Sequence, residues 1–197
     1  MPRVDGPYDI EAVKREWIGH SQGRGALGRF PVEYDPIRRF CRMVRDTNPL
    51  FLDPEYAKDG PYGEVIVPLP FVTSFTGGPP PRPPSGEAPA PRGFSAMMIP
   101  TPGDRYINMG VGYEYLKPVR VGDRLASETV ITDIFMKPIR LDPKAVWVVT
   151  ENRITNEDGE LVAIWRNTML SHRTPEEVEA DPETTALRGQ SAQPRSG

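Results

Sequence analysis

The feature that most constrains the fold is a change in hydrophobic period near Tyr106. Downstream of it, apolar and polar residues alternate with a period of two, which is typical of strands with one buried face. The alternation begins over about 106–116 and predicts further long strands over about 125–136, 145–155 and 161–172. Turn segments separate them, "VGD" (121–123) and "NEDG" (156–159). The pattern predicts an antiparallel meander.

The segments before the change follow helical spacing. Residues 9–18 place apolar side chains on one face, and Asp9 is positioned as the N-cap of that helix. Residues 35–46 predict a clearer helix, with Asp35 as N-cap and Pro36 in the first turn. Helices followed by an antiparallel sheet are typical of the α+β class.

The second helix is expected to end near Asp46, because Pro49 disfavours helical geometry in the residue before it. Asp53 and the proline after it predict one more short turn. Residues 69–76 predict a further helix with Pro70 in its first turn. An antiparallel sheet needs cover for its apolar face, and this segment is the best candidate to provide it.

Composition limits the classes of function. The 197 residues include 38% hydrophobic residues and carry a net charge of −3, with both signs interspersed, so one domain is expected and nucleic acid is not a predicted partner. A single cysteine, Cys41, excludes an internal disulfide and favours a cytoplasmic location. The N-terminal segment lacks the apolar run of a signal peptide. The longest uncharged run, 65–81, is broken by prolines, so no membrane span is predicted.

Proline is concentrated in "GGPPPRPPSGEAPAPRG", residues 77–93. Such a segment forms neither a helix nor a central strand. It predicts a polyproline-like surface loop, with a lid or a partner-docking arm as the alternative. The polar segment 174–197 is expected to be a disordered tail beyond a short helix, so the folded domain is predicted over 1–173.

Three segments together carry a family resemblance: "DTNPLFLDPEYA", "YGEVIVPLPF" and "YEYLKPVRVGDRL". In order and spacing they resemble the MaoC-like hydratase/dehydratase family, over roughly 8–172. The family signature is Asp-x-Asn-Pro-x-His-x-Asp followed by an apolar segment. The resemblance implies a hot-dog fold, in which an antiparallel sheet wraps around a helix. It also implies reversible hydration of 2-enoyl thioesters of coenzyme A or acyl carrier protein, without a metal or other cofactor.

In that family the signature Asp and His handle the water and the proton, and a backbone N–H at the start of the central helix stabilises the thioester oxyanion. This sequence keeps Asp46 and Asn48 but has Phe51 where the family has its His. The stretch "VPLP" (67–70) lies where catalytic members usually have a His-Gly pair, and Pro70 has no N–H to donate. The chain therefore resembles the dyad-less subunit of two-chain members, which pairs with a second hot-dog chain that carries the dyad.

The candidate catalytic residue is Asp46, with the alternative that its carboxylate only bonds nearby backbone N–H groups. The resemblance implies that Asn48, Phe51, Pro68 and Phe71 are substrate-binding residues. Asn48 also suits a turn before proline, and Phe51 also suits the core. A weaker possibility is that His172 replaces the missing base.

Two classes of function follow for the whole chain. In the first it is the non-catalytic or tunnel-forming subunit of a heteromeric enoyl-CoA hydratase. In the second it is an acyl-thioester binding or scaffold protein without turnover. A component of a 3-hydroxyacyl-ACP dehydratase is a further variant of the first class. Lys117, Arg120 and Arg124 are candidates for contact with coenzyme A phosphates, or are solvated surface residues.

Overall fold

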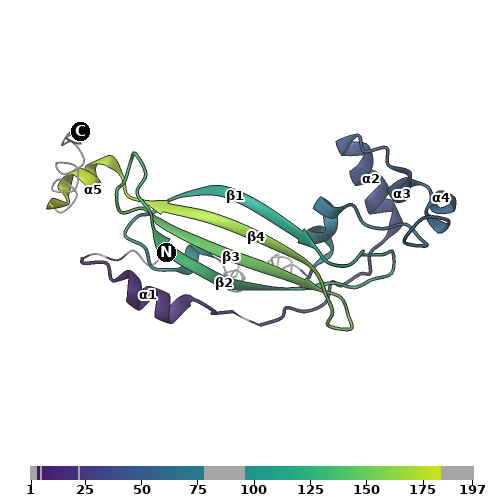
Figure 1. Ribbon diagram of the computed structural model, residues 1–197, viewed down its shortest axis with the longest axis horizontal. Coiled ribbons are helices and arrows are strands. Elements are labelled where there is room, and N and C mark those ends of the chain that lie inside the picture. Colours follow the sequence, from purple (N-terminus) through teal and green to yellow (C-terminus); the bar gives the residue numbers. More distant parts are fainter. Residues whose placement is uncertain (1–3, 5, 22, 78–95, 183–197) are drawn as a thin grey trace, which may run out of the picture.

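The computed structural model describes residues 4, 6–21, 23–77 and 96–182 (Figure 1). Its main element is one four-stranded antiparallel sheet with strand order β1-β4-β3-β2. The strands are β1 (Arg105–Tyr115), β2 (Ala126–Met136), β3 (Val146–Thr155) and β4 (Leu161–His172). The helices are α1 (Ile10–Trp17), α2 (Tyr34–Val44), α3 (Pro49–Leu52), α4 (Pro54–Lys58) and α5 (Pro175–Ala180), with 3₁₀ helices η1 (Leu69–Phe75) and η2 (Ala96–Met98). The α+β class is confirmed.

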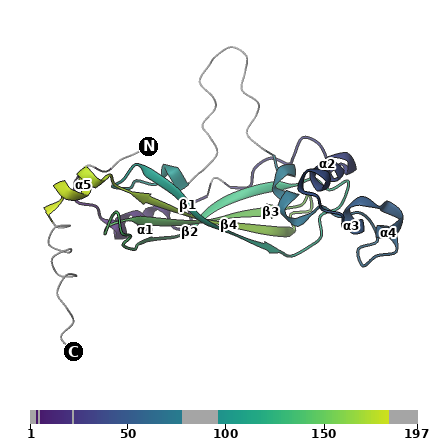
Figure 2. The same cartoon turned by 90° about the horizontal axis from the view of Figure 1, so that it is seen from above.

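The meander is confirmed for β2, β3 and β4, but β1 pairs with β4 and not with β2 as a full meander requires. The backbone N–H groups of Leu116 and Lys117 both donate to the carbonyl oxygen of Val162, which continues the β1–β4 pairing beyond the strand. The connection from β1 to β2 then crosses the end of the sheet. Strands β1 and β2 consequently form the two opposite edges (Figures 1 and 2).

The first helix follows its prediction, since the Asp9 side chain accepts a hydrogen bond from the Ala12 N–H at the start of α1. The N-cap predicted for the second helix is wrong. Helix α2 begins at Tyr34, with Glu33 at the N-cap, two residues before the predicted one, and no side-chain cap. Asp35 lies in the first turn, where its carboxylate pairs with Arg38 and Arg39 instead of capping the backbone. A carboxylate in the first turn still complements the helix dipole.

Two groups of buried apolar side chains lie at opposite ends of one face of the sheet, which we call the inner face. The α2-end core joins α2, η1 and the far ends of β3 and β4, and the α1-end core joins α1, η2, β2 and β3. Figure 1 shows α2, α3 and α4 beyond one end of the sheet and α1 beside β2 near the other. Fully buried members such as Ile37 and Ile134 each contribute about 1.5–3 kcal/mol.

The segment expected to be a central helix is a 3₁₀ helix, η1, and covers only one end of the inner face. Pro68 and Pro70 remove two backbone donors at its start, which limits regular α-helical bonding. Only Val72 of this helix is buried, against the α2-end core. Helix η2 contacts the other end, so two short 3₁₀ helices take the place of the one expected helix.

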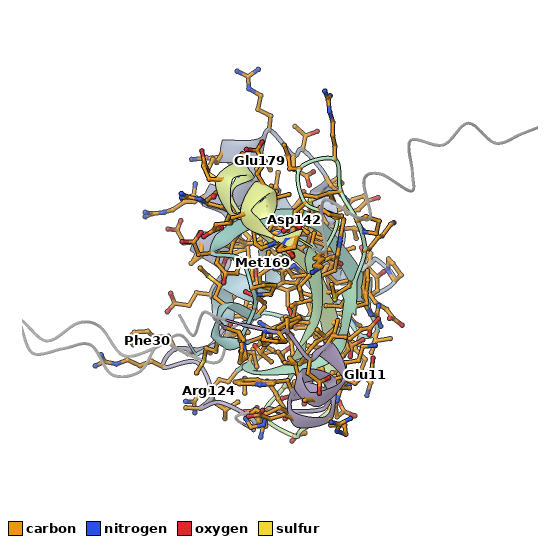
Figure 3. All side chains as sticks on the ribbon, turned by 90° about the vertical axis from the view of Figure 1, so that its left-hand side faces the viewer. Glu11, Phe30, Arg124, Asp142, Met169 and Glu179 are labelled. Atoms are coloured by element: carbon orange, nitrogen blue, oxygen red, sulfur yellow. The ribbon has the colours of Figure 1, made fainter. Side chains whose placement is uncertain are left out.

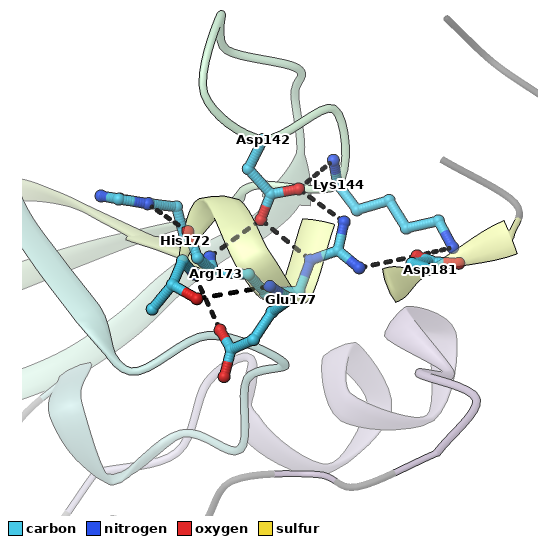
Figure 4. Close-up of polar contacts among 7 residues, drawn as sticks. Asp142, Lys144, His172, Arg173, Glu177 and Asp181 are labelled. Atoms are coloured by element: carbon cyan, nitrogen blue, oxygen red, sulfur yellow. Dashed lines mark hydrogen bonds and ion pairs between the residues drawn. The ribbon is translucent and has the colours of Figure 1, made fainter. Parts of the chain in front are cut away.

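The short helix expected at the start of the polar C-terminal segment is α5. Thr174 caps helix α5 in a capping box with Glu177, and the Val178 side chain is only 1% exposed. Arg173 and Asp181 form an ion pair that ties α5 to the end of β4 (Figure 4). Helix α5 is therefore packed onto the end of the sheet. Residues 183–197 of the tail, and nearly all of the proline-rich segment 77–93, lie outside the described residues.

Candidate functional site

The signature residues form a tight turn after helix α2. Arg45 has a left-handed conformation (φ 58°), which ends the helix, and the Asp46 N–H donates back to the Cys41 carbonyl at 2.8 Å. The Asp46 Oδ1 atom accepts the backbone N–H of Asn48 at 2.9 Å. Asn48 in turn caps α3, because its Oδ1 accepts the N–H of Leu50 at 3.0 Å. Both side chains therefore have backbone partners within the turn.

The Asp46 carboxylate lies close to a buried thiol. Burial raises the pKa of Cys41, and the negative charge of Asp46 raises it further. The thiol is therefore kept neutral and contributes to the core as a small apolar group. Among the described residues, no group of three or more metal-ligating side chains is found here or elsewhere.

The other predicted site residues lie on the apolar side of the same region. Phe51 is half-buried and packs against the α2-end core, and Pro68 is buried at the start of η1. Phe71 stacks on Phe40 of α2, with ring centroids 4.4 Å apart and an interplanar angle of 12°. It also meets Phe75 edge-on at 5.0 Å. Helices α2 and η1 are thereby held side by side.

A groove of about 550 Å³ runs along this contact. Its lining includes the apolar side chains of Phe40, Met43 and Phe71 and the charged side chains of Asp35 and Arg39, which we call its rim. A hydrogen bond from Arg38 and the pairing with Arg39 hold the pKa of the Asp35 carboxyl below its ordinary value, so the rim stays charged at neutral pH. Apolar lining residues with a charged rim suit an acyl chain attached to a polar carrier.

Within this chain, His172 lies too far from Asp46 to replace the family's histidine as the base. His172 ends β4 and pairs with Arg105 at the start of β1, at the opposite end of the sheet from α2 and Asp46 (Figure 1). Its Nδ1 atom lies 2.8 Å from the carbonyl oxygen of Arg173. The second histidine, His20, is exposed, with its ring 5.4 Å from that of Trp17.

The basic residues considered for coenzyme A phosphates already have partners. Lys117 pairs with Glu160 at 2.6 Å and Arg120 with Glu64 at 3.2 Å. Arg124 donates to the carbonyl oxygen of Gly28. The cavity that Lys117 and Arg120 line also has three carboxylates, from Asp123, Asp158 and Glu160. An excess of negative charge disfavours a polyphosphate ligand.

The two edges of the sheet differ in a way that sequence patterns did not show. The described residues of segment 19–28 cover the outer edge of β2, with a bridge from Ser21 to Val130 and backbone bonds from Gly25 to Ser127 and from Gly28 to Leu125, just before the strand. Among the described residues, no strand or bridge pairs with the outer edge of β1. Nine of the eleven β1 residues are exposed. They include four large apolar side chains, Ile107, Met109, Val111 and Tyr113, each 42–47% exposed.

Large apolar side chains are also exposed elsewhere. Phe30 is 65% exposed and projects from the periphery of the molecule (Figure 3), and Met43 is 73% exposed at the groove. Helical spacing identifies Phe40 but gives no reason to select Met43, which lies off the buried face of α2. Within the described ranges no helix is both long and apolar enough to cross a bilayer.

Comparison with known proteins places these features in a family. The family described as "FAS1-like, dehydratase domain region" matches residues 16–165. A UPF0336 protein of Mycobacterium tuberculosis is 30% identical over 164 residues, covering 76% of this chain and 84% of the relative. A probable enoyl-CoA hydratase alpha subunit of Thermomonospora curvata is 23% identical over 182 residues, covering 91% of this chain but only 57% of that protein.

Solved structures agree on the fold. A chain of the ChsH1–ChsH2 complex from Mycobacterium tuberculosis aligns with a TM-score of 0.63 and 16% identity, covering 84% of this chain and 91% of that one. The expected hot-dog fold is confirmed by this and by MaoC-like dehydratases of known structure. The MaoC-like resemblance of the chain is likewise confirmed, and the chain belongs to the FAS1-like dehydratase domain family, with the hot-dog fold of the MaoC-like dehydratases.

Proposed function

We propose that this chain is the non-catalytic subunit of a heteromeric enoyl-thioester hydratase, and that it pairs with a second hot-dog chain that carries the Asp/His dyad. The observation that carries the proposal concerns the contacts that the signature residues make. Phe51 packs against the core where a catalytic member has a histidine, and Asp46 accepts a backbone hydrogen bond. The relatives support a subunit role, since one is named as an alpha subunit and another comes from a two-chain complex.

Hydration of an enoyl thioester needs a base for the water, a proton for the α-carbon and a donor for the carbonyl oxygen. Phe51 exchanges no proton. Pro70 has no N–H, and the next amide along, that of Phe71, donates to the Pro68 carbonyl at 2.8 Å. The reacting groups are therefore assigned to the partner, while the groove along Phe40 and Phe71 supplies apolar wall for the acyl chain.

The partner is proposed to pair along β1. An open edge with exposed apolar side chains is a ready template for another strand, and the β2 edge is already covered by segment 19–28. Antiparallel addition to β1 would extend the sheet across both chains. It would also bring a partner strand against Val111 and Tyr113, which lie on the inner face with their register partners Asn167 and Trp165.

A double substitution tests this edge. Met109→Lys with Val111→Lys places two charges on the exposed edge, which should abolish co-elution with a dyad-bearing chain in size-exclusion chromatography. Because both side chains are nearly half exposed, the free energy of unfolding of the isolated chain should change by less than about 0.5 kcal/mol. Val121→Lys, in the turn before β2 and similarly exposed, is the matched control. Unchanged co-elution of the double variant would place the partner elsewhere.

A second candidate is an acyl-thioester binding or scaffold protein without turnover. The groove between α2 and η1 favours it, because apolar lining residues with charged residues beside them suit an acyl chain on a polar carrier. Co-expression followed by hydration assays separates the two, since a scaffold adds no activity to a dyad-bearing partner. Running the assay with coenzyme A and with acyl-carrier-protein thioesters distinguishes a hydratase from a 3-hydroxyacyl-ACP dehydratase component. No cofactor is required in either case, and the single reduced cysteine favours the cytoplasm.

A further inference from the structure

The inner face of the sheet is polar in its middle, between the two apolar cores. Strand register places Asn152 beside Thr129 and Trp165, and Asn167 beside Thr150 in the next row. The rows on either side are apolar: Val148 and Met169 on the α1 side, and Ile154 and Ala163 on the α2 side. Polar residues at inward positions of two central strands are unusual, since these positions normally carry the core.

These side chains line a pocket of about 270 Å³, which we call the middle-row pocket. Its walls are Thr129, Thr150, Asn152, Trp165, Asn167 and Met169 from the sheet, with Ala96 and Met97 from η2. Trp165 is held by its neighbour Tyr113, with ring centroids 6.4 Å apart and nearly parallel planes.

Three buried polar atoms in this pocket have no hydrogen-bond partner in the described part of the chain: Asn152 Oδ1, Asn167 Oδ1 and Trp165 Nε1. A buried donor or acceptor left unpaired destabilises the fold, and nearly all such atoms in folded proteins are paired. Apolar side chains at positions 152 and 167 would join the two cores into one. The polar residues therefore weaken the fold locally, which is typical of positions retained for binding.

We propose that the middle-row pocket binds a neutral, hydroxyl-bearing part of the acyl group, which makes the thioester substrate an oxygenated one. This extends the proposed hydratase role and rests on it for the identity of the substrate. Among the described residues that line the pocket none is charged, so they offer no counter-charge to a buried carboxylate, phosphate or amine. A hydroxyl group is both donor and acceptor, and can donate to an asparagine oxygen while accepting from the indole N–H.

Geometry and size agree with a subsite. Whole drug-sized ligands occupy about 300–1,000 Å³, so the pocket fits a ring or short branch and not an entire thioester. A rotated asparagine amide would present its NH₂ group instead of its oxygen, and a hydroxyl would still pair with it. A purely aliphatic ligand would leave all three polar atoms unpaired, which predicts discrimination against it.

Two-dimensional ¹H–¹⁵N NMR on the full-length isolated chain tests the pocket, with 1-indanol as probe and indane as its deoxy counterpart. The Trp165 indole N–H signal, assigned with Trp165→Phe, should shift with 1-indanol, and those of Trp17 and Trp147 should not. We expect 1-indanol to bind about tenfold more tightly than indane, as one to two neutral hydrogen bonds allow. Equal affinity for the two probes, or no shift of the Trp165 signal, would overturn the proposal.

Asn152→Leu and Asn167→Leu provide the second measurement. Each removes an unpaired acceptor at nearly constant volume, so each should raise the thermal midpoint by about 2–4 °C while abolishing the preference for 1-indanol. Thr168→Val, on the opposite face beside Asn167, is the control and should leave the preference intact. A preference that survives both leucine variants would refute the assignment. No partner and no turnover are involved, so this outcome is independent of the hydratase role.

Discussion

Purified alone, this chain is expected to show no detectable hydration of crotonyl-CoA or a longer enoyl-CoA. A general base contributes about 10²–10⁴-fold to such a rate, and one oxyanion donor about 10²–10³-fold. Under the proposed function the chain supplies neither group, because Phe51 stands in place of the family's histidine, Pro70 has no N–H, and the Phe71 N–H is bonded to the Pro68 carbonyl. If the two effects multiply, the rate is lower than that of a catalytic member by about 10⁴–10⁷-fold.

Addition of a dyad-bearing partner should restore turnover, and variants of each chain assign the chemistry. Asp46→Asn should lower the activity of the pair by less than about threefold, because the asparagine oxygen can still accept the Asn48 N–H. Replacement of the signature aspartate in the partner should abolish activity. Brisk turnover by the single chain, lost in Asp46→Asn, would instead identify Asp46 as the base.

The largest stability effect is expected at the junction of β4 and α5. Asp142 is fully buried in the connection between β2 and β3, and Arg173 contacts it through two guanidinium nitrogens, at 2.7 and 3.1 Å, and through its backbone N–H at 2.9 Å (Figure 4). A second carboxylate, Asp181 of the segment after α5, accepts from Arg173 at 2.6 Å. One arginine thus joins three separate segments.

Arg173→Ala should lower the free energy of unfolding by about 3–5 kcal/mol, because it leaves the Asp142 carboxylate buried without a counter-charge. The thermal midpoint should fall by about 6–20 °C in a chain of this size. Asp142→Asn removes the charge but keeps a polar side chain, so its loss should be smaller. Arg105→Ala is the control, since its pair with Asp104 is exposed and 3.6 Å long. Equal midpoints for Arg173→Ala and wild type would show that the junction contributes little.

The same junction predicts a pH dependence. Burial alone would raise the pKa of Asp142, but hydrogen bonds from Arg173 and from the Lys144 N–H outweigh it and hold this pKa below its ordinary value. A carboxyl with a lowered pKa in the folded state stabilises the protein above its unfolded pKa of about 3.9. That stabilisation should be lost as the pH falls through the folded value, and Asp142→Asn should reduce the acid sensitivity seen in denaturant titrations between pH 6 and 2.

Local sequence rules predicted the features that depend on neighbouring residues. The turn from Asp46 to Asn48 and the Asp53 cap of α4 follow from side chains that bond backbone groups two or three positions away. Strand β3 and its hairpin to β4 follow from alternation and from the "NEDG" turn. The family signature added the hot-dog fold, which periodicity by itself does not specify beyond α+β.

Contacts between distant segments decided the rest. Only the register of β3 against β4 shows that Asn152 and Asn167 enter one pocket, since each looks like an ordinary strand residue in sequence. The pairing of β1 with β4 places His172 at the opposite end of the sheet from Asp46. The same pairing leaves the outer edge of β1 without a strand partner among the described residues. The free energy of pairing a strand comes from partners far along the chain. The sequence therefore determined which residues form strands and turns. Tertiary packing determined which of their faces and edges remain available for a ligand or a partner.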